Sequence, residues 1–213
     1  MPFVLVHGGY HGPWCWDRLI PELELRGHRS VAVDLPVGDP GAGAAEYVDA
    51  IVRVASDLVD VILVGHSMGG LVLPLVPTRY PVTKMVFLCA LVPRPGMSMN
   101  QVRASEPVEN YQLQTSEFTD LGDGVWMIGP NTATELFYHD ASPELAAWAI
   151  ERLRPQAYKL LDELTSLVEW PVVESAFVLC RDDHALNPDW ARSVEVELRG
   201  DDLGGVGFIS PPG

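Results

Sequence analysis

The chain has 213 residues, 47% of them hydrophobic and 20% charged, and this composition is typical of one globular domain rather than of a disordered chain. The 29 acidic residues outnumber the 14 basic ones and give a net charge of −15, so we expect neither nucleic acid nor an anionic membrane surface as a partner. No apolar run approaches the roughly 18 residues of a membrane span. The N-terminus enters a short apolar run at once, without the pattern of a secretory signal, and we expect a cytoplasmic protein.

Three cysteines, Cys15, Cys89 and Cys180, are odd in number, far apart and set in apolar stretches. Cysteines of this kind are interpreted as buried thiols rather than as a disulfide or zinc framework. Their use agrees with a reducing cytoplasm.

Short β-rich runs alternate with helix-length segments, which is the pattern of a mostly parallel sheet with helices on both faces. Strands are predicted at residues 3–6, 30–34, 61–64, 85–89, 176–180 and 194–198. Apolar residues with helical spacing follow the first strand and the second, which predicts a βαβ crossover; they are Trp16, Leu19, Ile20 and Leu23, then Tyr47, Val48, Ile51, Ala55 and Leu58.

Between about residues 92 and 170 the strand rhythm stops, which predicts a cap inserted into a single domain that spans residues 1–213. Residues 97–129 show neither helical nor strand periodicity and are predicted to be irregular. A helical pattern follows at Leu145, Trp148, Ala149 and Leu153.

The predicted strand 61–64 runs directly into Gly65-His66-Ser67-Met68-Gly69-Gly70, followed by a segment of helical length. In a strand–turn–helix context, G-x-S-x-G holds a serine on a strained turn with its hydroxyl exposed, and flanking glycines let other backbone pass close by. Ser67 is therefore a candidate nucleophile. The alternative is a tight turn in an ordinary βα unit.

A second glycine-rich segment, His7-Gly8-Gly9-Tyr10-His11-Gly12, directly follows the first strand. Acyl transfer needs backbone N–H donors facing the nucleophile, and such a loop supplies one. The N–H groups of Gly9 and Met68 are the oxyanion-hole candidates. The alternative is a glycine turn with two structural histidines.

Together these segments resemble the α/β-hydrolases, and within them the plant methylesterases, the hydroxynitrile lyases and their bacterial relatives. The resemblance rests on residues 4–16, 34–36 and 64–70, on cap segments 137–140 and 152–156, and on residues 178–186. It implies the α/β-hydrolase fold with an inserted cap, and neither a metal nor an organic cofactor.

The resemblance also implies a Ser–Asp–His triad in that chain order. Ser67 takes the position of the nucleophile, and Asp183 takes that of the acid which orients the histidine, with Asp182 as the neighbouring alternative. Asp183 is otherwise a loop carboxylate that caps the segment starting near Asn187.

The triad histidine is missing from its expected place, where Gly205 stands when the chain is aligned on Phe208 and Ser210, and no histidine follows His184. The closing helix of the relatives is missing too, so the apolar face that it would cover is expected to be left open or buried against another copy. We therefore expect self-association into a homo-oligomer or low stability. Four explanations stay open: a non-native tail, a misalignment, another histidine acting as base, or a protein that has abandoned hydrolysis.

His139 in the cap and His184 beside Asp183 are the candidate replacement bases. His7, His11 and His66 are interpreted as structural groups, and His28 as a surface residue.

We expect an enzyme, an esterase-like α/β hydrolase that acts on a small apolar carboxylic ester or related carbonyl compound. Alternatives are a catalytically silent protein that binds a small ligand, and a cofactor-free lyase or cyclase. The expected pocket lies between the sheet's carboxyl edge and the cap, with candidate walls Tyr10, His11, Met68, Leu91, Trp126, Phe137 and His139.

Overall fold

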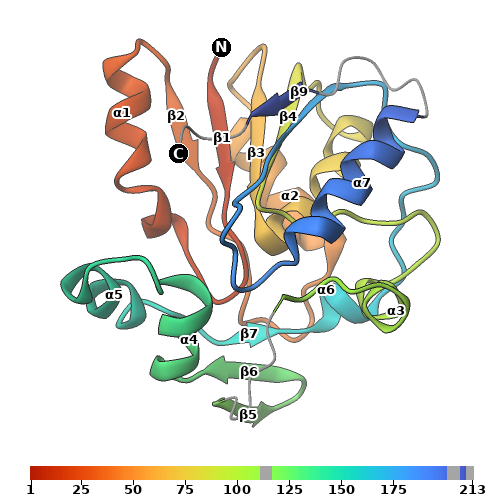
Figure 1. Cartoon of the computed structure of the whole chain (residues 1–213). Helices are drawn as coiled ribbons and strands as arrows, with labels where there is room; N and C mark the ends of the chain where they lie inside the picture. The colour runs from red at the N-terminus through yellow and green to blue at the C-terminus, as the bar shows by residue number, and fades with distance from the viewer. Residues whose placement is uncertain (111–116, 201–206, 210–213) are drawn as a thin grey trace.

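The computed structural model describes residues 1–110, 117–200 and 207–209, and is organised around a six-stranded sheet (Figure 1). The strands lie in the order β2-β1-β3-β4-β8-β9, and every neighbouring pair is parallel. Their bounds are β1 Phe3–Val6, β2 Ser30–Ala32, β3 Ile62–His66, β4 Lys84–Leu88, β8 Glu174–Val178 and β9 Gly207–Ile209.

The central strands are buried on both faces because their side chains alternate between two hydrophobic clusters. Val4 and Leu63 belong to the larger cluster, with α2 (Ala44–Ala55) and the 3₁₀ helix η3 (Leu73–Thr78). Leu5 and Val64 belong to the other cluster, with the 3₁₀ helix η1 (Pro13–Trp16) and α1 (Leu19–Leu25). The sheet is therefore covered by helices on both faces, as the sequence predicted.

The segment predicted as the last strand, residues 194–198, is instead part of helix α7 (Pro188–Gly200). Asn187 starts this helix, because its Oδ1 accepts a hydrogen bond from the N–H of Asp189 at 2.9 Å. Trp190 and Val194, four residues apart, are both buried in the larger cluster, which is the spacing of one helix face. The strand that closes this edge is β9, paired with β8.

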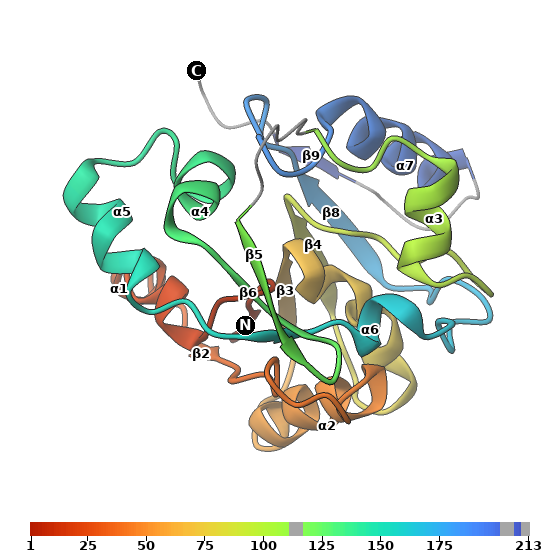
Figure 2. The ribbon, with the colours of Figure 1, turned by 90° about the horizontal axis from the view of Figure 1, so that it is seen from below.

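Most of the segment between β4 and β8, which we call the cap, lies beyond the carboxyl edge of the sheet, below it in Figure 1 and nearest the viewer in Figure 2. It contains α3 (Met99–Ser105), α4 (Pro130–Phe137), α5 (Pro143–Ile150), α6 (Lys159–Asp162) and a small antiparallel sheet of β5 (Phe118–Gly122), β6 (Val125–Ile128) and β7 (Gln156–Ala157). The expectation of an irregular 97–129 was wrong, because α3, β5 and β6 all fall within it. Each is shorter than the window over which hydrophobic periodicity becomes visible.

No helix within the described residues is long and apolar enough to cross a membrane. Gly205, the position of the expected triad histidine, lies outside the described residues. Residues 210–213, which bear on the prediction that a closing helix is missing, lie outside them too.

Candidate active site

Ser67 stands where β3 ends and the 3₁₀ helix η2 (Ser67–Leu71) begins, and its φ of +49° lies in the left-handed region. Few non-glycine residues adopt this conformation, which costs about 1–3 kcal/mol and persists only where the surrounding structure imposes it. Here the backbone crowds the turn. A Cβ on Gly69 would lie 2.7 Å from the carbonyl oxygen of His7, and one on Gly8 would lie 2.8 Å from Cβ of Ser67. The glycines thus permit the close approach of two loops, as the motif predicted.

Ser67 lines a cavity of about 430 Å³ between the carboxyl edge of the sheet and the cap. The predicted site residues Gly9, His11, Phe137, His139, Asp183 and His184 line the same cavity, as does Asp182. The structure therefore brings the serine, a glycine of the first loop and the candidate acid to one space.

Four predicted wall residues are not among those that line this cavity. Tyr10 is buried under the cap, and its hydroxyl lies 2.5 Å from that of Tyr158. Trp126 stacks on the same Tyr158, and the side chains of Leu91 and Met68 are buried in the core. Their aromatic or apolar character indicated burial but could not distinguish the cavity wall from the interior behind it.

Sequence reasoning missed most of the aromatic wall. Trp14, Trp16, Tyr138 and Trp148 line the cavity beside Phe137. Trp14, Trp16 and Tyr138 lie in segments that carry the resemblance, which was the available signal. Trp148 comes from α5, where no pattern marks a wall.

Asp183 lies on the loop that follows β8. Its Oδ1 accepts hydrogen bonds from the N–H groups of Ala185 at 2.8 Å and Leu186 at 2.9 Å, so the carboxylate orders its own loop, while Asn187 caps α7. Burial raises the pKa of Asp183, although the two backbone hydrogen bonds and the charges of His139 and His184 act in the opposite direction.

Cys89 and Cys180 form a disulfide, which corrects the interpretation of all three cysteines as buried thiols. Leu88 of β4 pairs with Val178 of β8, so residues just beyond the two strands meet although 91 positions separate them in sequence. The inference of a reducing compartment from cysteine usage loses its basis.

Cys15 remains a free thiol, and burial raises its pKa to about 12, so it stays protonated near neutral pH. Within the described part of the chain, one group of side chains has the spacing of metal ligands: Cys89, Cys180 and Asp183, with ligand atoms within 4.8 Å of one another. Two of these atoms are the disulfide sulfurs, which are not the thiolates that bind metal ions.

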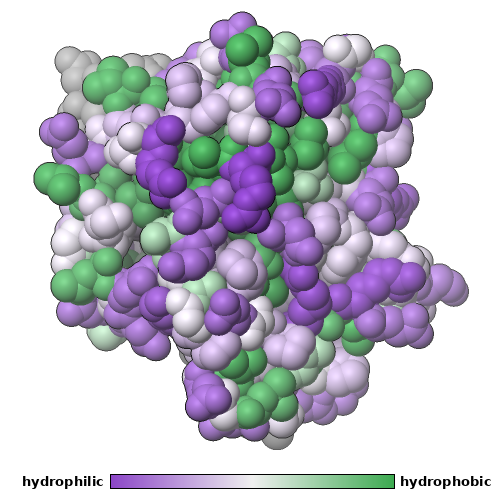
Figure 3. Space-filling view, turned by 180° about the vertical axis from the view of Figure 1, so that it is seen from behind, coloured by the Kyte–Doolittle hydropathy of each residue, from purple (hydrophilic) through white to green (hydrophobic). Residues whose placement is uncertain are grey.

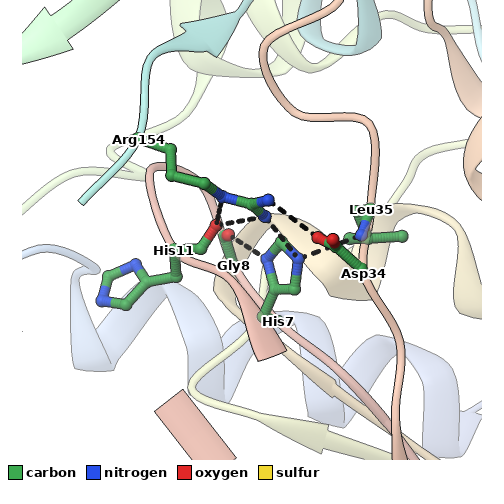
Figure 4. A network of polar contacts seen from close by, with 6 residues as sticks. All are labelled: His7, Gly8, His11, Asp34, Leu35 and Arg154. Atoms are coloured by element: carbon green, nitrogen blue, oxygen red, sulfur yellow. Dashed lines mark hydrogen bonds and ion pairs between the residues drawn. The ribbon is translucent and has the colours of Figure 1, made fainter. Parts of the chain in front are cut away.

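The glycine-rich loop, residues 7–12, is held by a polar network (Figure 4). Arg154, from the cap, donates two hydrogen bonds to the carbonyl oxygen of His11 and one to Oδ1 of Asp34. His7 is fully buried within the same network, and burial lowers its pKa to about 4. The N–H of Gly9 donates to no other residue in the described ranges, and is thus free to meet a ligand in the cavity.

Four histidines line the cavity, and two of them are poor bases. Burial lowers the pKa of His66 to about 3 and also lowers that of His11. Both ring nitrogens of His11 are engaged, Nδ1 with the carbonyl oxygen of Gly9 at 2.6 Å and Nε2 with the hydroxyl of Tyr138 at 2.8 Å.

The other two, His139 and His184, stack face to face with ring centroids 3.6 Å apart. Nδ1 of His184 lies 3.0 Å from the carbonyl oxygen of Glu135, which can only accept, so Nδ1 carries a proton and Nε2 is the nitrogen that can act as a base. The pair joins the acid loop to the cap beside Asp183.

Known proteins are similar to this chain in sequence and in fold. The sequence model of the alpha/beta hydrolase family matches residues 3–207. Methylesterase 3 from Arabidopsis thaliana is 31% identical over 90% of this chain and 81% of the relative, and salicylic acid-binding protein 2 from Nicotiana tabacum is 29% identical over 89% and 82%. The crystal structure of polyneuridine aldehyde esterase matches with a TM-score of 0.80 and 26% identity, over 98% of this chain and 89% of that one.

Proposed function

Since the chain belongs to the alpha/beta hydrolase family and is an esterase-like member of it, we propose that it hydrolyses small, largely apolar carboxylic esters with Ser67 as nucleophile. The observation that carries the proposal is the position of Ser67, on a left-handed turn at the wall of a cavity shared with Asp183 and Gly9. The names of the relatives support ester chemistry, and the aromatic wall supports an apolar substrate.

The reaction begins with attack of Oγ of Ser67 on the ester carbonyl. The negative charge that develops on the carbonyl oxygen is stabilised by the N–H groups of Gly9 and Met68, which are fixed in place before the reaction. Loss of the alcohol, which takes up the proton removed from Ser67, leaves an acyl group on Ser67, and water then releases the acid and restores the serine.

A serine hydroxyl attacks slowly unless a base removes its proton. His139 or His184 supplies this base, because His11 and His66, the other histidines of the cavity, have lowered pKa values. Asp183 favours the protonated imidazole by its charge. Near neutral pH this carboxylate must be ionised to do so, despite the burial that raises its pKa.

Steady-state hydrolysis of p-nitrophenyl butyrate by matched variants tests the proposal. Ser67→Ala should lower kcat/KM by about 10² or more, whereas Ser105→Ala, an exposed serine on α3, should leave it unchanged. His139→Ala and His184→Ala are compared in the same assay, and the base is the histidine whose replacement lowers kcat.

Two outcomes would contradict the proposal. Turnover that survives Ser67→Ala would indicate a lyase or cyclase that uses another group in the same cavity. Tight binding of an aryl ester or acid without any turnover by the parent protein would indicate a silent ligand-binding protein.

A further inference from the structure

Arg154 lies in the cap just before β7, and it grips the backbone of the glycine-rich loop. Its Nε and Nη2 donate to the carbonyl oxygen of His11 at 2.9 and 2.8 Å (Figure 4). Its backbone N–H donates to the carbonyl oxygen of Tyr10 at 2.7 Å. Gln156 accepts the N–H of Tyr10 at 3.2 Å. Tyr10 has a φ of +62°, so the cap holds both sides of the residue whose backbone is most strained in this loop.

Arg154 and the backbone N–H of Leu35 together determine which nitrogen of His7 carries the proton. Nε2 of His7 lies 3.2 Å from Nη2 of Arg154 and 3.2 Å from the backbone N–H of Leu35. Both partners only donate, so Nε2 must present its lone pair and the proton must reside on Nδ1. Nδ1 then donates to the carbonyl oxygen of Gly8 at 2.9 Å.

That hydrogen bond holds the peptide unit that contains the N–H of Gly9. The carbonyl of Gly8 and the N–H of Gly9 belong to one planar unit and point in opposite directions, so holding the first also orients the second. Gly9 lines the cavity, and the chain at Gly8 passes so close to Ser67 that an added Cβ would lie 2.8 Å from Cβ of the serine.

We propose that Arg154 is a positioning residue, which holds His7 in its Nδ1–H form and thereby aims the N–H of Gly9 at the oxyanion. The inference rests on the proposed function, in which that N–H is an oxyanion donor. The ion pair with Asp34 orients the guanidinium; the Asp34 side chain is 65% exposed, so the pair adds little stability, and the contacts with the loop carry the effect.

The groups that face His7 predict how it responds to the loss of Arg154. Three charged or titratable side chains act on the ring electrostatically: Arg154 and His11, which lower its pKa, and Asp34, which raises it. Removal of the guanidinium should therefore raise the pKa of His7, and it leaves the N–H of Leu35 as the one donor to Nε2.

Four proteins test the inference: the parent, Arg154→Met, Arg154→Lys and the control Arg79→Met. Arg79 forms a comparable half-exposed ion pair with Asp49, at 2.7 Å, on α2 away from the cavity. Arg154→Met should lower kcat for p-nitrophenyl butyrate about 10-fold with little change in KM, a fraction of the 10²–10³ lost when an oxyanion donor is removed. Arg154→Lys keeps one donor and should recover part of kcat, and Arg79→Met should match the parent.

Two-bond ¹H–¹⁵N spectra of the imidazoles give a readout that does not depend on turnover. In the parent, His7 should remain the neutral Nδ1–H form from pH 7 to about pH 4. In Arg154→Met it should titrate at higher pH, with a shift of the Gly9 amide resonance. If Met does not fold, Arg154→Gln, which also removes the positive charge, carries the same test.

An unchanged His7 and Gly9 in the uncharged Arg154 variant would overturn the inference, and so would an altered His7 with an unchanged kcat in that variant. If the parent hydrolyses no ester, the proposed function fails, while the resonances of His7 and Gly9 still decide whether Arg154 positions them.

Discussion

At the scale of single residues, the site depends on places where a side chain must be absent. Ser67 adopts its left-handed conformation beside Gly8 and Gly69, whose missing Cβ atoms leave room for two loops to touch. The conformation of Ser67 is thus maintained by the packing of the glycine-rich loop against it as well as by the turn in which it lies.

Gly8→Ala should lower kcat for aryl esters by about 10-fold or more, because the new Cβ would lie 2.8 Å from Cβ of Ser67 and must displace the nucleophile or the loop. Gly38→Ala is the matched control, since its Cβ would meet only the carbonyl oxygen of Pro155 at an ordinary 3.5 Å. Equal activities of the two variants would show that the contact between Gly8 and Ser67 does not constrain the reaction.

At the scale of elements, the disulfide joins the ends of β4 and β8 and so links two parts of the site. Cys89 is followed closely by Leu91, whose N–H donates to the carbonyl oxygen of Ser67 at 3.0 Å. Cys180 precedes Asp183 by three residues. The disulfide therefore joins the segment that donates a hydrogen bond to Ser67 to the loop that carries Asp183.

Replacement of both cysteines, Cys89→Ala with Cys180→Ala, should lower the free energy of unfolding by about 4–5 kcal/mol, the chain-entropy expectation for closing a loop of 91 residues. Urea unfolding of the variant and the parent measures the difference. As a control, thiol titration of the denatured parent without reductant should detect Cys15 alone. A variant as stable as the parent, or a parent that titrates all three cysteines, would contradict the bond.

At the scale of the whole molecule, a strongly acidic surface encloses a core that holds neutral histidines. The net charge is −15, and the face in Figure 3 shows hydrophobic side chains gathered in patches between hydrophilic ones. Burial lowers the pKa of His7 to about 4 and that of His66 to about 3, both below the value of 6.5 expected in the unfolded chain.

These histidines should make the protein less stable in mild acid. Below pH 6.5 these histidines are protonated in the unfolded chain but stay neutral in the folded chain. As the pH is lowered, each therefore reduces the free energy of unfolding by about 1.4 kcal/mol per pH unit until its folded pKa is reached. Their contribution is fully present above pH 6.5. Urea unfolding between pH 7 and pH 5 should show this fall, and a shallower one in His66→Gln; identical slopes would mean that His66 is not held neutral.

Local patterns in the sequence were sufficient for the parallel sheet, the elbow at Ser67 and the loop at Gly9, because each depends on neighbours in the chain. The prediction failed where distant segments decide the structure. The alternation of Val194, Val196 and Leu198 resembled a strand, whereas burial of Trp190 and Val194 on one face places them on a helix. Cys89 and Cys180 meet only because β4 and β8 pair, and no spacing along the chain reveals that.

Trapping of an acyl-enzyme shows directly whether Ser67 is the nucleophile of an ester hydrolase. The parent protein is mixed with p-nitrophenyl acetate, quenched in acid during turnover and mapped by peptide mass spectrometry. We expect one acetyl group on the peptide that contains Ser67, and none on this peptide in Ser67→Ala. Turnover of the ester with acetyl groups only on other residues, or with no acetylated Ser67 at any quench time, would contradict this role of Ser67.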